Sequence, residues 1–115
     1  MHETAVVEGL MRILTEHAKQ NGVDRVVAVR LKIGRLRGID SRQIRLAFEI
    51  FAEGTLAEGA RLDIDEIDVT AKCRTCDTVF EVKKYHFVCS GCGGSDAEVL
   101  TGRELYIENF EAARS

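Results

Sequence analysis

The stretch CRTCDTVFEVKKYHFVCSGC, residues 73–92, contains all four cysteines of the chain. They form two C-x2-C pairs that twelve residues separate. A pair on one tight turn directs both sulfurs to one point, and two such turns complete the tetrahedron that zinc prefers. In a reducing compartment two matched pairs favour a metal site, with a redox dithiol as the alternative. Because four thiolates leave no open position, the spacing predicts a structural zinc held by Cys73, Cys76, Cys89 and Cys92.

Two segments outside this stretch have the apolar periodicity of amphipathic helices, at residues 4–20 and 41–53. Asp40 or Ser41 is expected to cap the second helix, since both side chains accept hydrogen bonds from the free N–H groups of a first turn. Asp40 and Gln43 also have the spacing of a capping box.

Three further segments alternate between apolar and polar residues as strands do: residues 26–33, 61–71 and 103–110. In the first strand, one side is expected to carry the apolar residues and the other Arg30 and Lys32. The apolar residues are Val27, Val29, Leu31 and Ile33. In the second strand the apolar parity breaks between residues 64 and 67, which suggests a bulge. Short strands are expected inside the cysteine stretch near residues 79–82 and 85–88.

The order of these elements predicts an α+β protein in which two helices pack on a three-stranded mixed sheet, with an inserted zinc-ribbon module. The helices and the sheet define one domain, residues 1–71 plus 101–115. The module, residues 72–100, is the second domain. It is expected to need its metal to fold, because about 30 residues cannot build a core unaided.

Charge and hydropathy narrow the range of functions. The chain has 16 basic and 19 acidic residues, a net charge of −3, and no apolar run reaches the roughly 20 residues that span a membrane. Six basic residues lie within 30–45 and four acidic residues within 63–68. These charged segments are expected to be either solvent-exposed faces or a docking surface for a protein partner. The first residues lack the pattern of a signal peptide, so a cytoplasmic protein is expected.

A zinc-ribbon nucleic-acid-binding module is the alternative function. Such modules usually carry a basic surface, whereas residues 72–100 are neutral, so no nucleic-acid partner is expected. No Ser/His/Asp set, phosphate-binding loop or paired-carboxylate site stands out, and the chain is therefore not predicted to be an enzyme. His17 and His86 are expected to be surface residues.

Met1, His2 and Glu3 form a second candidate metal site. The terminal amine, the His2 amide nitrogen and the His2 imidazole can close a five-membered and a six-membered ring on one ion. Three nitrogens in one plane suit Ni(II) or Cu(II). Glu3, or Asp40 if the second helix begins nearby, is expected to neutralise the ion. Taken alone, a histidine at position 2 is more typical of a frayed terminus than of a metal site.

Several motifs in the same order resemble the HypA/HybF family, the nickel-insertion accessory proteins of nickel–iron hydrogenase maturation. Beside the two cysteine pairs, the matching stretches are MHE at 1–3, IGRLRGI at 33–39, AFE at 47–49, EGARL at 58–62 and GREL at 102–105. The resemblance covers essentially the whole chain. It implies a metallochaperone with a structural zinc at the four cysteines.

The resemblance also implies the cargo and the partners. Nickel would be held by Met1, His2 and Glu3, with Asp40 as a further candidate ligand. The expected partners are the GTPase HypB and the hydrogenase large subunit, and urease maturation proteins are further candidates because some members serve urease. A monomer or weak homodimer with no membrane partner is expected.

Overall fold

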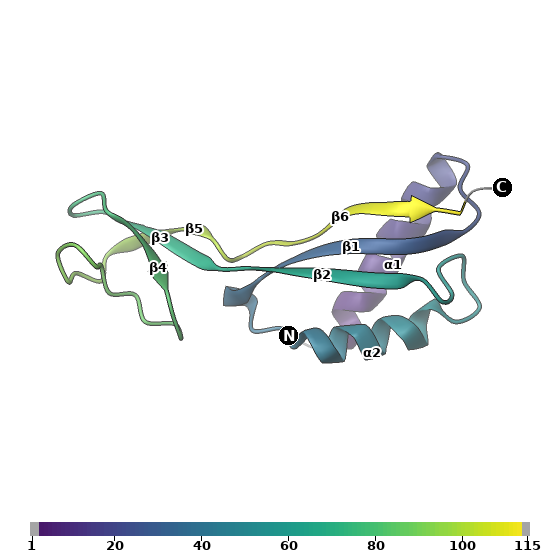
Figure 1. Cartoon of the computed structure of the whole chain (residues 1–115), viewed down its shortest axis with the longest axis horizontal. Coiled ribbons are helices and arrows are strands. Elements are labelled where there is room, and N and C mark those ends of the chain that lie inside the picture. The colour runs from purple at the N-terminus through teal and green to yellow at the C-terminus, as the bar shows by residue number, and fades with distance from the viewer. Residues whose placement is uncertain (1–2, 114–115) are drawn as a thin grey trace. The chain divides into compact units, whose positions relative to one another are not determined.

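The structure is a computed structural model that describes residues 3–113, and it divides into two compact units (Figure 1). The described part of the first unit comprises residues 3–32, 38–65 and 106–113. The second unit comprises residues 33–37 and 66–105, and so includes segments on both sides of the cysteine stretch. None of the helices in the described range is long and apolar enough to cross a lipid bilayer.

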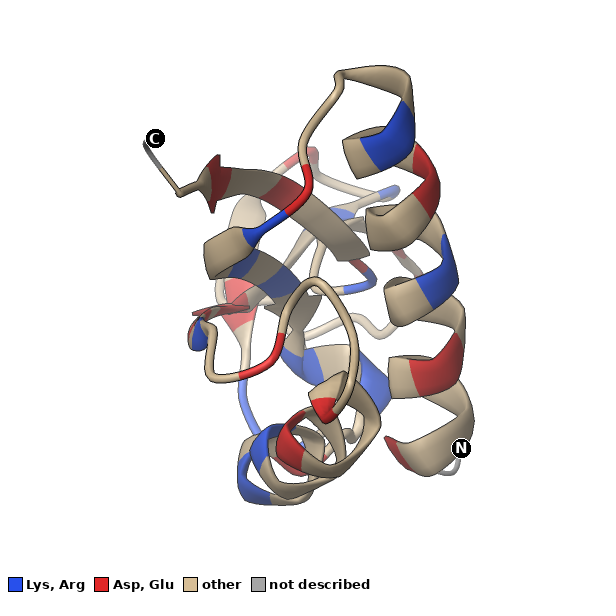
Figure 2. Ribbon diagram, turned by 90° about the vertical axis from the view of Figure 1, so that its right-hand side faces the viewer, with Lys and Arg blue, Asp and Glu red and all other residues tan. Residues whose placement is uncertain are grey.

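Two helices, α1 (Glu3–Gln20) and α2 (Ser41–Ala52), belong to the first unit. Each buries one stripe of side chains, as the apolar periodicity predicts. The buried residues are Val7, Met11, Leu14 and Ala18 in α1, and Ile44, Ala47, Phe48 and Ala52 in α2. Figure 2 shows the acidic and basic residues of α1 along the side that faces away from the sheet.

Asp40, one of the two predicted candidates, is the N-cap of α2. Its carboxylate accepts a hydrogen bond from the backbone N–H of Arg42 at 2.9 Å. The Asp40 N–H, which a capping box would direct to Gln43, instead donates to the Glu3 carboxylate at 3.4 Å. The start of α1 therefore lies beside the start of α2.

A three-stranded sheet, ordered β2-β1-β6, supports the two helices. Its strands are β1 (Val26–Gly34), β2 (Arg61–Ile67) and β6 (Leu105–Ala112). Figure 1 shows β1 and β2 running in the same direction. β6 runs in the opposite direction, since Gly34 bonds to Glu104 at one end of the pair and Ala113 to Arg25 at the other. The predicted mixed sheet is confirmed.

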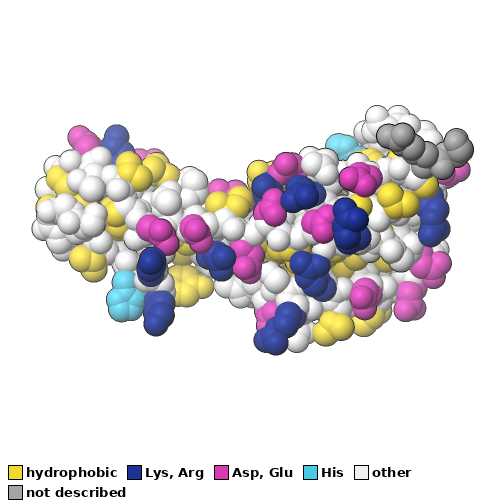
Figure 3. Space-filling model, in the orientation of Figure 1, with side chains coloured by type: hydrophobic (Ala, Val, Ile, Leu, Met, Phe, Trp, Pro, Cys, Tyr) yellow, Lys and Arg dark blue, Asp and Glu magenta, His cyan; other side chains and the backbone are white. Residues whose placement is uncertain are grey.

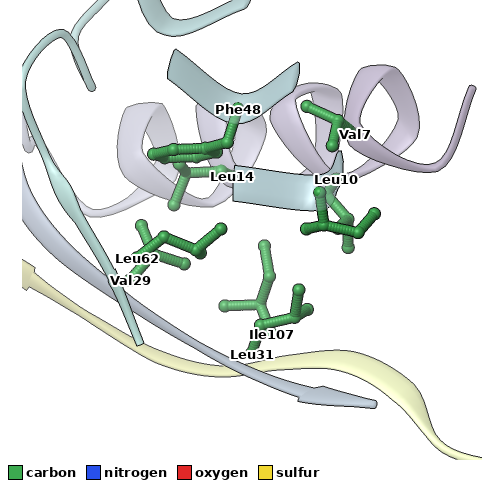
Figure 4. Close-up of a pocket in the computed structure, with 9 residues that line it drawn as sticks. Val7, Leu10, Leu14, Val29, Leu31, Phe48, Leu62 and Ile107 are labelled. Atoms are coloured by element: carbon green, nitrogen blue, oxygen red, sulfur yellow. The ribbon is translucent and has the colours of Figure 1, made fainter. Parts of the chain in front are cut away.

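The core of the first unit lies between the helices and this sheet (Figure 4). The side chains that meet there are Val7, Leu10, Leu14, Val29, Leu31, Ile44, Phe48, Leu62 and Ile107. The space left among them is only about 10 Å³ and has a wholly apolar lining. It offers a water molecule too little room and no polar partner, so it is a packing gap and not a ligand site.

At the start of β1 the buried side chain is Val26, and its neighbour Val27 is 40% exposed. The prediction of one bulged strand over residues 61–71 is wrong. A second strand, β3 (Val69–Cys73), begins after Asp68 and belongs to a different sheet. The break in apolar parity marks this change of sheet.

β3 is the central strand of the second unit and is antiparallel to β4 (Val79–Val82) and β5 (Ala97–Thr101). The strand predicted at 79–82 is confirmed. The strand predicted at 85–88 does not form. The chain makes a tight turn here instead, closed by a single β-bridge between Lys83 and His86. β5, which was not predicted, completes the sheet. The buried cluster consists of Val69, Ala71, Cys73, Phe80, Val82 and Cys89.

A close backbone contact between Gly34 and Gly102 lies beside this sheet. A Cβ atom on Gly34 would lie 2.0 Å from the carbonyl carbon and oxygen of Gly102, so only glycine fits. The segment that follows Gly34 is a short 3-10 helix, η1 (Arg35–Arg37). Its Leu36 N–H donates to the Gly102 carbonyl at 2.9 Å, and the Leu36 side chain packs on the buried cluster.

The basic and acidic segments noted in the sequence pair with each other. In the first unit Arg30 and Lys32 both reach Asp65, at 3.1 and 2.7 Å. In the second unit Arg35 binds Asp68 at 2.7 Å. The uneven charge along the chain therefore reflects ion pairs between neighbouring strands and loops.

The Asp65 pairing predicts a pH-dependent contribution to stability. Hydrogen bonds from Lys32 and Arg30 hold the pKa of Asp65 below its ordinary value. A lowered folded-state pKa stabilises the fold above the ordinary aspartate pKa of about 3.9, and this contribution is lost as the pH falls through the folded-state value. We expect Asp65→Asn to lower the unfolding midpoint of the first unit at pH 7. The difference from the wild type should shrink below about pH 4.

Thermal unfolding followed by the amide signals of the first unit, from neutral to acid pH, checks this prediction. Asp24→Asn, at an exposed position outside the ion pairs, is the matched control and should leave the midpoint unchanged. A difference between wild type and Asp65→Asn that does not vary with pH would contradict the pairing.

Candidate metal sites

Four cysteine side chains gather in the second unit. The sulfur atoms of Cys73, Cys76, Cys89 and Cys92 all lie within 4.8 Å of one another. Cys73 and Cys92 are 3.6 Å apart, and Cys76 and Cys89 are 3.5 Å apart. Four thiolates about 2.3 Å from a tetrahedral zinc lie about 3.8 Å from one another. The sulfurs therefore fit one zinc ion, and the predicted clustering of the cysteines is confirmed.

Each cysteine pair is held by a turn whose backbone supports the sulfurs. In the first turn the Asp77 N–H donates to the Cys73 carbonyl at 2.9 Å, with Asp77 at a positive φ of 61°. In the second turn the N–H groups of Gly91 and Cys92 point to the Cys89 sulfur at 3.3 and 3.4 Å. Such N–H groups can donate hydrogen bonds to a sulfur that binds a metal.

The pKa values of the thiols differ widely across the cluster. Side-chain and backbone hydrogen bonds to Thr78 lower the pKa of Cys76 to about 6. The Gly94 N–H lowers the pKa of Cys92, but the neighbouring thiols of Cys73 and Cys76 outweigh it and raise that pKa to about 11. Zinc binding near neutral pH must therefore displace the proton of Cys92. The role of Thr78 was not predicted, because it depends on where the hydroxyl group lies in the folded chain.

The nickel site predicted at the N-terminus falls partly outside the described residues, which exclude Met1 and His2. Glu3 and Asp40, the two predicted carboxylate ligands, are neighbours, because the Glu3 carboxylate accepts the Asp40 N–H. One oxygen of Asp40 already caps α2 through Arg42. Ligation of nickel by these residues stays a prediction.

The remaining histidines are surface residues, as expected. His17 is exposed near the end of α1, and His86 is exposed on the turn after β4. Across residues 3–113, the four cysteines are the only group of three or more potential ligands close enough to share a metal ion.

Comparison with known proteins identifies the family to which the chain belongs. Residues 1–112 match the model of a family described as HypA, a hydrogenase/urease nickel incorporation metallochaperone. The chain belongs to the HypA family. This membership confirms the resemblance carried by the N-terminal MHE motif and the paired cysteines, and HypA proteins are maturation factors.

HypA relatives from other organisms match over nearly their whole length. The chain is 39% identical over 112 residues to hydrogenase maturation factor HypA of Caldanaerobacter subterraneus subsp. tengcongensis, covering 96% of this chain and 98% of the relative. It is 37% identical to hydrogenase maturation factor HypA of Rhodobacter capsulatus, with the same coverage. The solution structure of the Ni metallochaperone HypA from Helicobacter pylori is similar, with a TM-score of 0.72, 31% identity and full coverage of both chains.

Proposed function

We propose that this protein binds Ni(II) at its N-terminus and delivers it during hydrogenase maturation. Membership of the HypA family over residues 1–112 carries the proposal. The ligands are the Met1 amine, the His2 amide and imidazole nitrogens, and Glu3. Asp40 is a further candidate, supported by its contact with Glu3.

A chelate at a chain terminus suits a carrier. Two ring closures provide affinity, and the open faces of a square-planar ion let the ligands of a partner attack. The amine has an ordinary pKa of about 7.7–8.0, so nickel must displace its proton near neutral pH. Cu(II) binds such ligands more tightly than Ni(II), so metal availability and the partner must supply selectivity.

The first unit serves in this proposal as the nickel-binding domain. Glu3 is the first residue of α1, and Asp40 caps α2. The hydrogen bond from the Asp40 N–H to the Glu3 carboxylate joins the two helix ends, and Glu3 directly follows the chelating residues in the sequence. Carboxylates there would offset the positive charge of the bound ion.

The second unit serves as a zinc-binding domain with a structural role. Its four sulfurs supply every corner of a tetrahedron, which leaves no position for a substrate or an activated water. Cys73 and Cys89 are buried and also belong to the small apolar cluster of the unit. Zinc in this place would fix the fold of the unit instead of taking part in a reaction.

The proposed partners are the GTPase HypB and the large subunit of nickel–iron hydrogenase. Urease maturation proteins are further candidate partners, since the family takes part in nickel incorporation into both hydrogenase and urease. We place the protein in the cytoplasm as a monomer or weak homodimer that does not act as an enzyme.

Titration of Ni(II) into the protein with its native N-terminus, and into a version with one extra residue before Met1, tests the nickel site. We expect the native protein to bind one nickel tightly and the extended protein to lose this binding, because the extension removes the amine from the chelate ring. Calorimetry measures the affinity, and a zinc assay shows that both proteins keep the cysteine site loaded.

His17→Ala is the matched control for histidine loss, because His17 is exposed on α1 away from the proposed ligands. It should bind nickel as the native protein does, whereas His2→Ala should not. Equal nickel affinity in the native and the extended protein would place the nickel elsewhere and refute the terminal site.

A further inference from the structure

The turn that follows β4 has a sequence poorly suited to its backbone. Lys84 and Tyr85 have positive φ angles of 52° and 62°, and the His86 N–H donates to the Lys83 carbonyl at 3.0 Å. Two successive left-handed residues form a type I′ turn, for which Asn-Gly is preferred because larger side chains crowd the backbone there. A turn built for stability alone would therefore not carry Lys-Tyr.

The side chains of this turn are exposed and unengaged. Tyr85 is 61% exposed, and nearby Val88 is 57% exposed. Within the part of the chain that the structure describes, no hydrogen bond or ion pair engages the side chain of Lys83 or Lys84, whereas Lys32 contacts two carboxylates. Figure 3 shows basic and histidine side chains gathered where β4 ends. The turn thus combines free positive charge with exposed apolar surface.

We propose that the turn Lys83–His86, together with Val88, is a docking site for an acidic segment of a partner protein that also carries apolar side chains. Adjacent lysines attract carboxylates and raise the rate of encounter, while tyrosine and valine supply apolar contact area. The site goes beyond nickel delivery, because it lies in the second unit and includes none of the proposed metal ligands.

The charge of the second unit favours an acidic peptide over a nucleic acid. Its residues, 33–37 and 66–105, include seven basic and seven acidic side chains, and the whole chain has a net charge of −3. Binding to a phosphate backbone needs an extended basic surface that neutralises several phosphates. The lysine pair is too local for that and matches the few carboxylates of a short peptide segment.

The test uses the zinc-loaded, full-length protein labelled with nitrogen-15. A short synthetic peptide of Glu, Asp and Leu is the probe, a peptide with Gln and Asn in place of the acids is the neutral control, and a single-stranded DNA oligonucleotide is the competing polyanion. We expect the acidic peptide to shift the amide signals of residues 83–88, and the shifts to weaken as salt is added. The neutral peptide and the DNA should bind less tightly.

The double variant Lys84→Asn/Tyr85→Gly separates docking from folding. It suits the type I′ turn better, so its melting temperature should rise, while its affinity for the acidic peptide should fall about five-fold or more. Lys72→Gln, which changes an exposed lysine on β3, is the matched control and should keep the affinity. Unchanged affinity in the double variant, shifts centred outside residues 83–88, or tighter binding of DNA would overturn the proposal.

Discussion

Removal of zinc is expected to unfold the second unit while the first unit keeps its structure. The buried cluster of the second unit is small, and two of its members, Cys73 and Cys89, are proposed zinc ligands. A unit of this size with so little apolar core does not fold by hydrophobic burial alone. Zinc contributes about 10–16 kcal/mol in small zinc-finger peptides at pH 7, which exceeds the stability of most domains.

The first unit does not depend on this ion for its core. Its buried side chains come from two helices and three strands, and they pack with almost no empty space. We therefore expect the amide signals of residues 66–105 to lose their dispersion after chelation, while those of Leu14 and Leu31 stay dispersed. Nitrogen-15 spectra of the full chain, recorded with and without chelator, measure this difference.

Cys73→Ser should reproduce the effect of chelation without any added reagent. Ser90→Ala is the matched control, because Ser90 lies between the cysteines of the second pair and is exposed. It should keep both zinc and the native spectrum. A dispersed spectrum for residues 66–105 after complete zinc removal, shown by elemental analysis, would contradict a structural role for the metal.

Gly34→Ala is the second substitution with a large expected effect. The added Cβ would lie 2.0 Å from the carbonyl atoms of Gly102, far inside van der Waals contact. Because those atoms belong to the backbone, they cannot move aside as the end of a flexible side chain does. Relief requires the two segments to separate, which would weaken the hydrogen bond between Leu36 and Gly102. We expect a loss of about 3 kcal/mol in the free energy of unfolding.

Denaturant unfolding of the zinc-loaded protein measures this loss, and Gly9→Ala is the control of opposite sign. Gly9 lies inside α1, where a Cβ would meet no atom within 4 Å. Alanine favours a helix interior over glycine by about 0.5–1 kcal/mol, so this variant should be more stable than the wild type. Wild-type stability in Gly34→Ala would show that the close contact with Gly102 does not exist.

Much of the candidate metal chemistry could be predicted from local sequence. The C-x2-C spacing directs two sulfurs to one point whatever the rest of the chain does, and the structure confirms that the two pairs meet. Thr78 could not be identified in this way, because its effect on the pKa of Cys76 depends on where its hydroxyl lies after folding. The turn at Lys83–His86 was not predicted for a similar reason, since a Lys-Tyr sequence does not indicate a turn.

Local spacing was enough to predict α1 and α2 and to limit the cap of α2 to Asp40 or Ser41, because periodic burial and capping involve residues only a few positions apart. The division of residues 61–71 between two sheets was not predictable in this way. Neither were the contacts of Glu3 with Asp40 and of Gly34 with Gly102. The two contacts join segments that are more than 30 residues apart. They form only when the chain closes long loops and the packing of the whole fold offsets the lost conformational entropy, which no local pattern encodes.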